Sequence, residues 1–284
     1  MALAFTTIIS AAELAEHLDD PTWAILDARF TLDDEQWGKA AFAAGHIPGA
    51  QQADLGTDMA GPIITGVTGR RPFPEPDEFA RRLGEWGIGD STQVIAYDAD
   101  GGLMAASRLW LMLRWLGHDS VAVLDGGLPA WLASGGAITT DDGSRGSRPF
   151  TVRLRPELLA DVDEVDAARV LPLTCVFDSR GAEGYHGGGV YQDAIRGHIA
   201  GAGLADRAET KTTDGRFRSA DELRAHYLSL IGDVPPSEVI FYCGSGVTAA
   251  QNMLGMEIAG LPGARMYVGS WSEWITDPSR PVEL

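Results

Sequence analysis

Short runs of β-branched and aromatic residues alternate along the chain with longer segments whose apolar residues recur at helical spacing. Val94-Ile-Ala-Tyr-Asp98 and Val239-Ile-Phe-Tyr-Cys243 are runs of the first kind, and residues 105–115 and 221–228 are segments of the second kind. Short apolar runs favour strands, whereas apolar positions that recur once per helical turn favour helices. The alternation predicts an α/β fold in which helices flank a mainly parallel sheet.

Motifs of the first half of the chain return in the second half in the same order. The paired motifs are Leu26-Asp-Ala-Arg29 with Phe177-Asp-Ser-Arg180, Gly45-His-Ile-Pro-Gly-Ala50 with Gly197-His-Ile-Ala-Gly-Ala202, Val94-Ile-Ala-Tyr-Asp98 with Val239-Ile-Phe-Tyr-Cys243, and Gly126-Gly-Leu-Pro-Ala-Trp131 with Gly269-Ser-Trp-Ser-Glu-Trp274. Chance matches would not keep both their order and a nearly constant spacing. The repeat therefore predicts two tandem domains of one fold.

The stretch between the two halves is rich in glycine, serine and charged residues, which is typical of a linker. We expect a first domain over residues 1–135, a linker over 136–152 and a second domain over 153–284. The length of 284 residues agrees with two domains, because single cores rarely grow so large.

The composition is that of an ordinary globular protein, with 45% hydrophobic and 22% charged residues. No apolar stretch approaches the length of a membrane span, and the N-terminal residues do not resemble a signal peptide. Two cysteines provide no disulfide framework, which agrees with a reducing compartment, so we expect a cytoplasmic protein. The net charge of −18 argues against nucleic acid and anionic membranes as partners.

Cys243 lies between an apolar run and a turn of small residues that opens into a helix. Unsatisfied N–H groups at a helix start stabilise a thiolate over a thiol, and a thiolate is nucleophilic at neutral pH. Gly244 and Gly246 let the backbone curl around the sulfur. A free cysteine is more often a core residue, and Cys175 fits that role. Asp98 matches Cys243 in the repeat, so only the second half can perform thiol chemistry.

The loop Cys243-Gly-Ser-Gly-Val-Thr-Ala249 resembles the active-site loop of the mercaptopyruvate branch of the rhodanese-type sulfurtransferases. The resemblance covers nearly the whole chain and implies tandem rhodanese-like domains, of which the first is catalytically silent and the second is active. The Cys243 thiolate is then expected to take the outer sulfur of a small anionic donor as a persulfide. Cyanide, a small thiol or a thioredoxin-like protein would remove that sulfur. This chemistry requires no metal and no cofactor.

The loop supplies polar groups for the bound sulfur. Backbone N–H groups from Gly244 to Thr248, which include those of Gly246 and Val247, are expected to hold its negative charge. The resemblance implies that Ser245 helps to deliver a proton as the enolate product leaves, although a serine here can also cap the next helix. The Thr248 hydroxyl either meets the sulfur or caps the helix.

Other parts of the pocket depart from the mercaptopyruvate branch. The resemblance implies two arginines that hold the substrate carboxylate, but Gly184 stands at the first position and residues 187–193 replace the segment of the second. It also implies an acidic residue and a histidine in the first half, and the aligned positions here are Gly56 and Arg71. The proton relay of the branch is therefore absent in that form.

Arg71 is the best candidate for an anion-binding cation, because it lies in a proline-rich loop and a guanidinium binds carboxylates in a bidentate manner. A solvated basic pair, Arg70 and Arg71, is the alternative. Arg196 is a weaker candidate for the same role, and His186 is a candidate substrate contact because it has no counterpart in the repeat.

The remaining residues shared by both halves are expected to be structural: Arg29, Arg180, His46, His198, Trp131 and Trp274.

Cysteine phosphatases use a similar anion cradle but close it with an arginine, which this loop lacks. We therefore expect a sulfurtransferase with a donor like 3-mercaptopyruvate. Thiosulfate is the second donor to consider, although thiosulfate-preferring relatives carry basic residues where Gly244 and Ser245 stand. A sulfur-relay or redox module remains the non-enzymatic alternative.

Overall fold

The computed structural model describes residues 4–31, 33–102, 104–188 and 192–284. The described chain forms two compact units, and neither is continuous in sequence. Residues Met1–Gly61, Phe73–Arg155 and Thr213–Phe217 form the first unit, and Pro62–Pro72, Pro156–Thr212 and Arg218–Leu284 form the second. Each half thus contributes one short segment to the unit that the other half builds.

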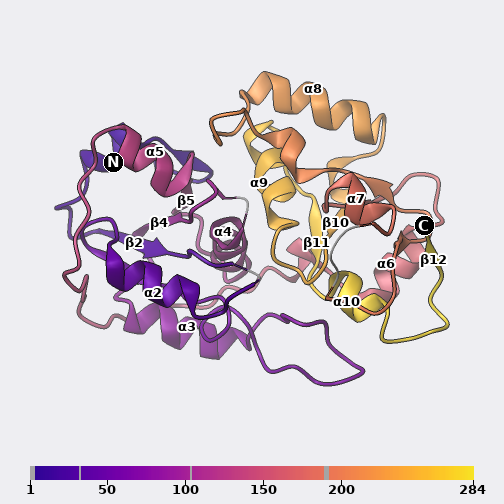
Figure 1. The fold of residues 1–284 in the computed structure, drawn as a ribbon, viewed down its shortest axis with the longest axis horizontal. Coiled ribbons are helices and arrows are strands. Elements are labelled where there is room, and N and C mark those ends of the chain that lie inside the picture. The colour runs from indigo at the N-terminus through magenta and orange to yellow at the C-terminus, as the bar shows by residue number, and fades with distance from the viewer. Residues whose placement is uncertain (1–3, 32, 103, 189–191) are drawn as a thin grey trace. The chain divides into compact units, whose positions relative to one another are not determined.

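A five-stranded sheet in the order β1-β5-β4-β2-β3 forms the centre of the first unit, and helices flank it (Figure 1). All of its strand pairs are parallel. The strands are β1 (Ile8–Ile9), β2 (Trp23–Asp27), β3 (Ala50–Gln52), β4 (Gln93–Tyr97) and β5 (Val121–Leu124). The helices are α1 (Ala11–Ala15), α2 (Trp37–Ala44), α3 (Pro76–Glu85), α4 (Ala105–Trp115) and α5 (Gly127–Ala133).

The second unit repeats this arrangement with a five-stranded parallel sheet in the order β6-β11-β10-β7-β9. Its strands are β6 (Leu159–Ala160), β7 (Cys175–Asp178), β9 (Gly203–Leu204), β10 (Val239–Tyr242) and β11 (Arg265–Tyr267), and β8 (His198–Ile199) pairs separately with β12 (Val282–Glu283). Its helices are α6 (Val162–Ala168), α7 (Ala182–Tyr185), α8 (Ala220–Ile231), α9 (Ala250–Ile258) and α10 (Ser270–Trp274), with three short 3-10 helices at Pro156–Leu158, Arg207–Thr210 and Pro236–Glu238. The matching strand order confirms the predicted α/β fold with a tandem repeat.

Local sequence signals explain where several helices begin. Ser10 caps α1 and Asp161 caps α6, and in both the glutamate at the third helical position bonds back to the cap backbone. Such reciprocal capping satisfies donors that a helix start otherwise leaves unpaired. The α4 helix spans residues 105–115 as predicted and is buried on nearly all sides, which explains its apolar composition.

In each unit, a largely buried pair of an aspartate and an arginine lies at the carboxyl end of a central strand. Asp27 accepts hydrogen bonds from the Arg29 side chain, whose Nη2 also donates to the Gly45 carbonyl oxygen at 2.7 Å. Asp178 and Arg180 repeat this pair, and Arg180 Nη2 donates to the Gly197 carbonyl oxygen at 2.7 Å. The repeated arginines therefore anchor the turns of the Gly-His-Ile motifs, and their contacts are those of scaffold residues.

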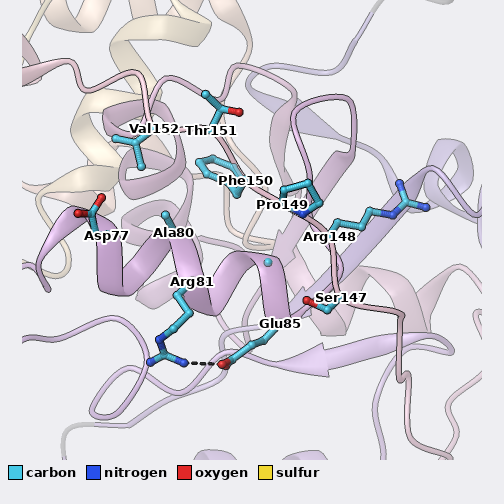
Figure 2. Close-up of a pocket in the computed structure, with 11 residues that line it drawn as sticks. Asp77, Ala80, Arg81, Glu85, Ser147, Arg148, Pro149, Phe150, Thr151 and Val152 are labelled. Carbon is cyan, nitrogen blue, oxygen red and sulfur yellow. Dashed lines mark hydrogen bonds and ion pairs between the residues drawn. The ribbon is translucent and has the colours of Figure 1, made fainter.

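Residues 136–152 pack against the first unit. Thr139 pairs with His46 in an isolated β-bridge, and the Arg148 N–H donates to the Gly84 carbonyl oxygen at 3.0 Å. An open pocket of about 720 Å³ lies between α3 and residues 147–152 (Figure 2). The stretch expected to be a linker thus has defined contacts with α3.

None of the described helices is both long and apolar enough to cross a lipid bilayer.

Candidate active site

Cys243 is the first residue after β10, the strand in the middle of the second sheet. Its side chain is buried, and residues 244–249 form the loop that leads to α9. Open α/β sheets commonly bind ligands at the carboxyl ends of their central strands. The fold therefore places the only cysteine with a glycine-rich collar where α/β proteins usually hold their ligands.

The surroundings of the Cys243 sulfur favour a thiolate. Burial by itself raises the pKa of this thiol, because the charged form loses its hydration. The Thr248 hydroxyl and the backbone N–H groups of Ser245, Ala249 and Val247 donate to the sulfur, and together they bring the pKa below its ordinary value. The loop thus stabilises a buried anion by hydrogen bonds, and the Arg180 guanidinium interacts electrostatically with Cys243 as well.

The two cysteines differ in kind. Cys175 begins β7 instead of following a strand, and it is only partly buried. Hydrogen bonds do not lower its pKa as they lower that of Cys243. Burial raises the pKa of the Cys175 thiol. A raised pKa disfavours the nucleophilic form, so these surroundings favour Cys243 over Cys175 as a nucleophile.

Gly246 gives the loop its curvature. Its φ is 75°, and a Cβ placed there would lie 2.1 Å from the Val268 carbonyl oxygen. Both the left-handed backbone and the close approach require glycine. Gly244 has a different role, because its carbonyl oxygen accepts the Ser272 N–H at 3.0 Å and ties the loop to α10.

Ser270 lies beside Cys243, and it was not predicted from the sequence. Its Oγ accepts the Cys243 N–H at 3.1 Å, donates to the Tyr267 carbonyl oxygen at 2.9 Å and lies 4.0 Å from Cys243 Sγ. The side chain is fully buried. The paired motifs carried a signal for it, because Ser270 stands where the first half has Gly127.

The corresponding loop of the first unit holds a carboxylate. Asp98 follows β4, and its Oδ1 accepts the N–H groups of Asp100 at 2.9 Å and Gly102 at 2.8 Å. Its Oδ2 accepts the N–H groups of Met104 at 3.3 Å and Ala106 at 3.2 Å. The first half therefore builds the same anion cradle around an internal anion, which agrees with its having no thiol chemistry.

Arg70 lies close to the Cys243 loop. It belongs to the segment Pro62–Pro72 of the second unit, and its Nη2 lies 3.6 Å from the point where a Cβ on Gly244 would stand. Nη1 forms an ion pair with Asp193. Arg71, the residue favoured by the sequence, is half-buried in the same segment, and the expectation that it binds an anion stays a prediction.

Other candidates from the sequence lie in the scaffold around α7. His186 caps the C-terminus of α7 and meets the Tyr185 ring edge-on at 4.9 Å. Tyr185 stacks on His198 at 3.6 Å, and its hydroxyl donates to the Ala202 carbonyl oxygen at 2.7 Å. These contacts are those of structural residues for Tyr185 and His198. The role of His186 as a substrate contact stays a prediction.

The positions that depart from the mercaptopyruvate branch also have defined surroundings. Gly184 lies in α7, where a Cβ would be 3.3 Å from Arg180 Cβ. Gly56 lies in the first unit, and its N–H donates to Asp54 Oδ1 at 2.9 Å in a turn.

Within the described ranges, no cluster of His, Cys, Asp and Glu side chains is suited to a metal ion.

Comparisons with known proteins agree with this architecture. Residues 10–134 and 157–277 each match the rhodanese-like domain. A protein of Pseudomonas aeruginosa named probable 3-mercaptopyruvate sulfurtransferase is 41% identical over 276 residues, which cover 97% of either chain. The thiosulfate sulfurtransferase of Rattus norvegicus is 30% identical over 280 residues, covering 95% of this chain and 92% of that protein.

Solved structures show the same relationship. The crystal structure of SseA from Escherichia coli, described as a 3-mercaptopyruvate sulfotransferase, superposes with a TM-score of 0.81 at 31% identity. The match covers 95% of this chain and all of that one. The resemblance read from the Cys243 loop is thereby confirmed at the level of the family, and the chain belongs to the rhodanese-like sulfurtransferases as a protein of two tandem domains.

Proposed function

We propose that the protein transfers a sulfane sulfur from a small anionic donor, 3-mercaptopyruvate or a close analogue, to a thiol or cyanide through a persulfide on Cys243. The observation that carries the proposal is the set of donors around the Cys243 sulfur, which lowers its pKa although the side chain is buried. A buried thiolate that accepts hydrogen bonds is a preorganised nucleophile.

In the first half-reaction the Cys243 thiolate attacks the sulfur of the donor. An S–S bond forms as the C–S bond of 3-mercaptopyruvate breaks, and the electron pair of that bond leaves on the carbon fragment as an enolate, which then takes up a proton. Ser245 lies next but one to the nucleophile and is buried, which makes it the candidate to pass this proton.

In the second half-reaction an acceptor thiolate or cyanide attacks the outer sulfur and releases the Cys243 thiolate. The N–H groups that hold the thiolate stand ready to receive the charge again, so one cradle serves both steps. Two half-reactions on one residue predict ping-pong kinetics. A reducing cytoplasm, our proposed location, would keep Cys243 free between turnovers.

The test is to mix the protein with one donor at a time, without acceptor, and to measure the mass of the peptide that bears Cys243. We expect the added mass of one sulfur atom with 3-mercaptopyruvate, and its loss on addition of cyanide. Cys243→Ser should show neither the adduct nor turnover, whereas Cys175→Ser should show both.

Three outcomes would contradict parts of this proposal. Turnover without an adduct would contradict the persulfide route. A stronger response to thiosulfate would change the donor, since a relative with that activity in its name spans nearly the whole chain. A persulfide that forms only from a protein donor would indicate a sulfur-relay module instead of an enzyme for small donors.

A further inference from the structure

The backbone of Arg70 is joined to the Cys243 loop through Ser272. The Arg70 N–H donates to Ser272 Oγ at 3.0 Å, and the Ser272 N–H donates to the Gly244 carbonyl oxygen at 3.0 Å. Ser272 Oγ in turn lies 3.2 Å from the Gly269 carbonyl oxygen, to which it donates. One serine of α10 thus fixes the position of Arg70 relative to the residue that follows the nucleophile.

Gly69 allows this close approach. A Cβ at Gly69 would lie 2.3 Å from the Gly269 carbonyl oxygen and 2.8 Å from Ser272 Oγ, so a larger residue would push the segment away from α10. The segment Pro62–Pro72 is therefore fitted to the second unit at the one point that sets where the Arg70 side chain begins.

The Arg70 guanidinium lies between an acidic side chain and the loop. Nη1 is paired with Asp193, while Nη2 lies 3.6 Å from the point where a Cβ on Gly244 would stand. The Arg70 side chain is 31% exposed and that of Asp193 is 12% exposed. A guanidinium carries five donors in a planar fork and can serve more than one anionic group, so a paired arginine can still bind an incoming anion.

We propose that Arg70 binds the anionic group of the sulfur donor, a carboxylate or a sulfur oxyanion, and that Asp193 competes with the donor for this guanidinium. The inference rests on the proposed sulfurtransferase function and names the residue that sets its donor class. Arg70 takes the part that the resemblance assigns to an arginine at the position of Gly184.

The charge of the protein gives this contact its importance. A donor anion approaches a chain of net charge −18 and a thiolate at Cys243, and both repel it. A cation beside Gly244 offsets this repulsion at the point of attack. Asp193 keeps the cation oriented when no donor is present, and a donor must replace part of that ion pair.

Alkylation of Cys243 tests the proposal without any sulfur donor. Iodoacetate is an anion and iodoacetamide is its neutral analogue, and the thiolate displaces iodide from each. The ratio of the two rate constants reports the local potential at the sulfur. The measurement is made on the full chain carrying Cys175→Ser, so that only Cys243 reacts.

We expect Arg70→Ala to lower the iodoacetate-to-iodoacetamide ratio by about tenfold, as for the loss of a charge-assisted contact. The alanine keeps the backbone N–H that bonds to Ser272, so only the guanidinium is removed. Arg70→Lys should retain part of the ratio, and Asp193→Asn should raise it. Arg81→Ala, on α3 of the first unit with its side chain 63% exposed, is the matched control and should leave the ratio unchanged.

Steady-state kinetics then separate the donor anions. Arg70→Ala should raise the KM for 3-mercaptopyruvate, thiosulfate or both by about tenfold with a smaller change in kcat, and the donor affected identifies the anionic group that Arg70 holds. Failure to form a persulfide would sink the proposed function but would leave the alkylation ratio as a valid measurement.

Two results would overturn the proposal. One is an alkylation ratio that Arg70→Ala does not change, in a protein that unfolds at the wild-type temperature. The other is a ratio that falls for Arg71→Ala and not for Arg70→Ala, which would place the cation where the sequence predicted it.

Discussion

Ser270 in the second half adopts the left-handed backbone conformation of Gly127 in the first half, with φ of 55° and 57°, respectively. Among the described residues Ser270 is the only one other than glycine with a positive φ. A side chain in this conformation costs roughly 1–2 kcal/mol. The serine is nevertheless placed where its Oγ accepts the Cys243 N–H, and strain of this kind marks functional sites.

Substitution of Ser270 separates the strain from the hydrogen bond. Ser270→Gly relieves the backbone but removes Oγ, so we expect only a small change in the free energy of unfolding. Ser270→Ala keeps the strain and leaves the buried Cys243 N–H without its acceptor, so it should lower that free energy by about 1–3 kcal/mol. Urea denaturation measures both, and equal stability of the two variants would contradict this account.

Thr248 is expected to tune the nucleophile through its hydroxyl. Thr248→Val removes one donor from the sulfur, and a hydrogen bond to a charged group is worth about 1.5–3 kcal/mol, so the pKa of Cys243 should rise. The pH dependence of alkylation by iodoacetamide reports that pKa. Thr248→Ser keeps the hydroxyl and should titrate like the wild type. A valine variant with an unshifted profile would show that the backbone donors alone hold the thiolate.

The lowered pKa of Cys243 also makes stability depend on pH. The folded thiol loses its proton at a lower pH than the unfolded thiol, whose pKa is about 8.5. Between these two values the unfolded state binds more protons, so the free energy of unfolding rises with pH. The contribution is fully present above the unfolded pKa and is lost as the pH falls through the folded pKa.

Comparison with Cys243→Ala isolates this contribution. The difference in unfolding free energy between wild type and variant should grow as the pH rises through that window and should be constant below it. Parallel curves across the whole range would show that the folded thiol titrates like a free cysteine.

Asp98 should be important for the stability of the first unit. Asp98→Ala leaves the donors of its loop unpaired, and we expect a loss of at least about 3 kcal/mol, since each hydrogen bond to a charged group contributes about 1.5–3 kcal/mol. Sulfate should restore part of this stability by entering the vacated cradle, and it should raise the melting temperature of the variant more than that of the wild type. A variant that responds to sulfate no more than the wild type would argue against an open anion site.

Local patterns were enough to predict the architecture and the backbone cradle around Cys243. The paired motifs predicted two domains of one α/β fold, and the small residues after Cys243 predicted a backbone cradle for its sulfur. Both depend on neighbours in sequence, because strands, turns and helix starts are determined over short distances.

The parts that escaped prediction depend on residues far apart in the chain. Arg70 meets Ser272 across 202 positions, and no local pattern indicates which of two adjacent arginines does so. The transfer of Pro62–Pro72 to the second unit is a matter of packing as well. Ser270 could have been found, since a serine aligned with a glycine before a buried tryptophan is a visible anomaly in the repeat.

The carboxylate in the first unit and the sulfur in the second unit occupy corresponding loops of the repeat. In both loops, backbone N–H groups surround one anionic group. In the first unit this group is the carboxylate of Asp98, which is a permanent part of the chain. In the second unit it is the sulfur of Cys243, which can bind a further sulfur atom and then transfer it to an acceptor. The side chain that follows the strand thus determines whether this anion-holding turn contains an internal carboxylate or a sulfur that can accept a further atom.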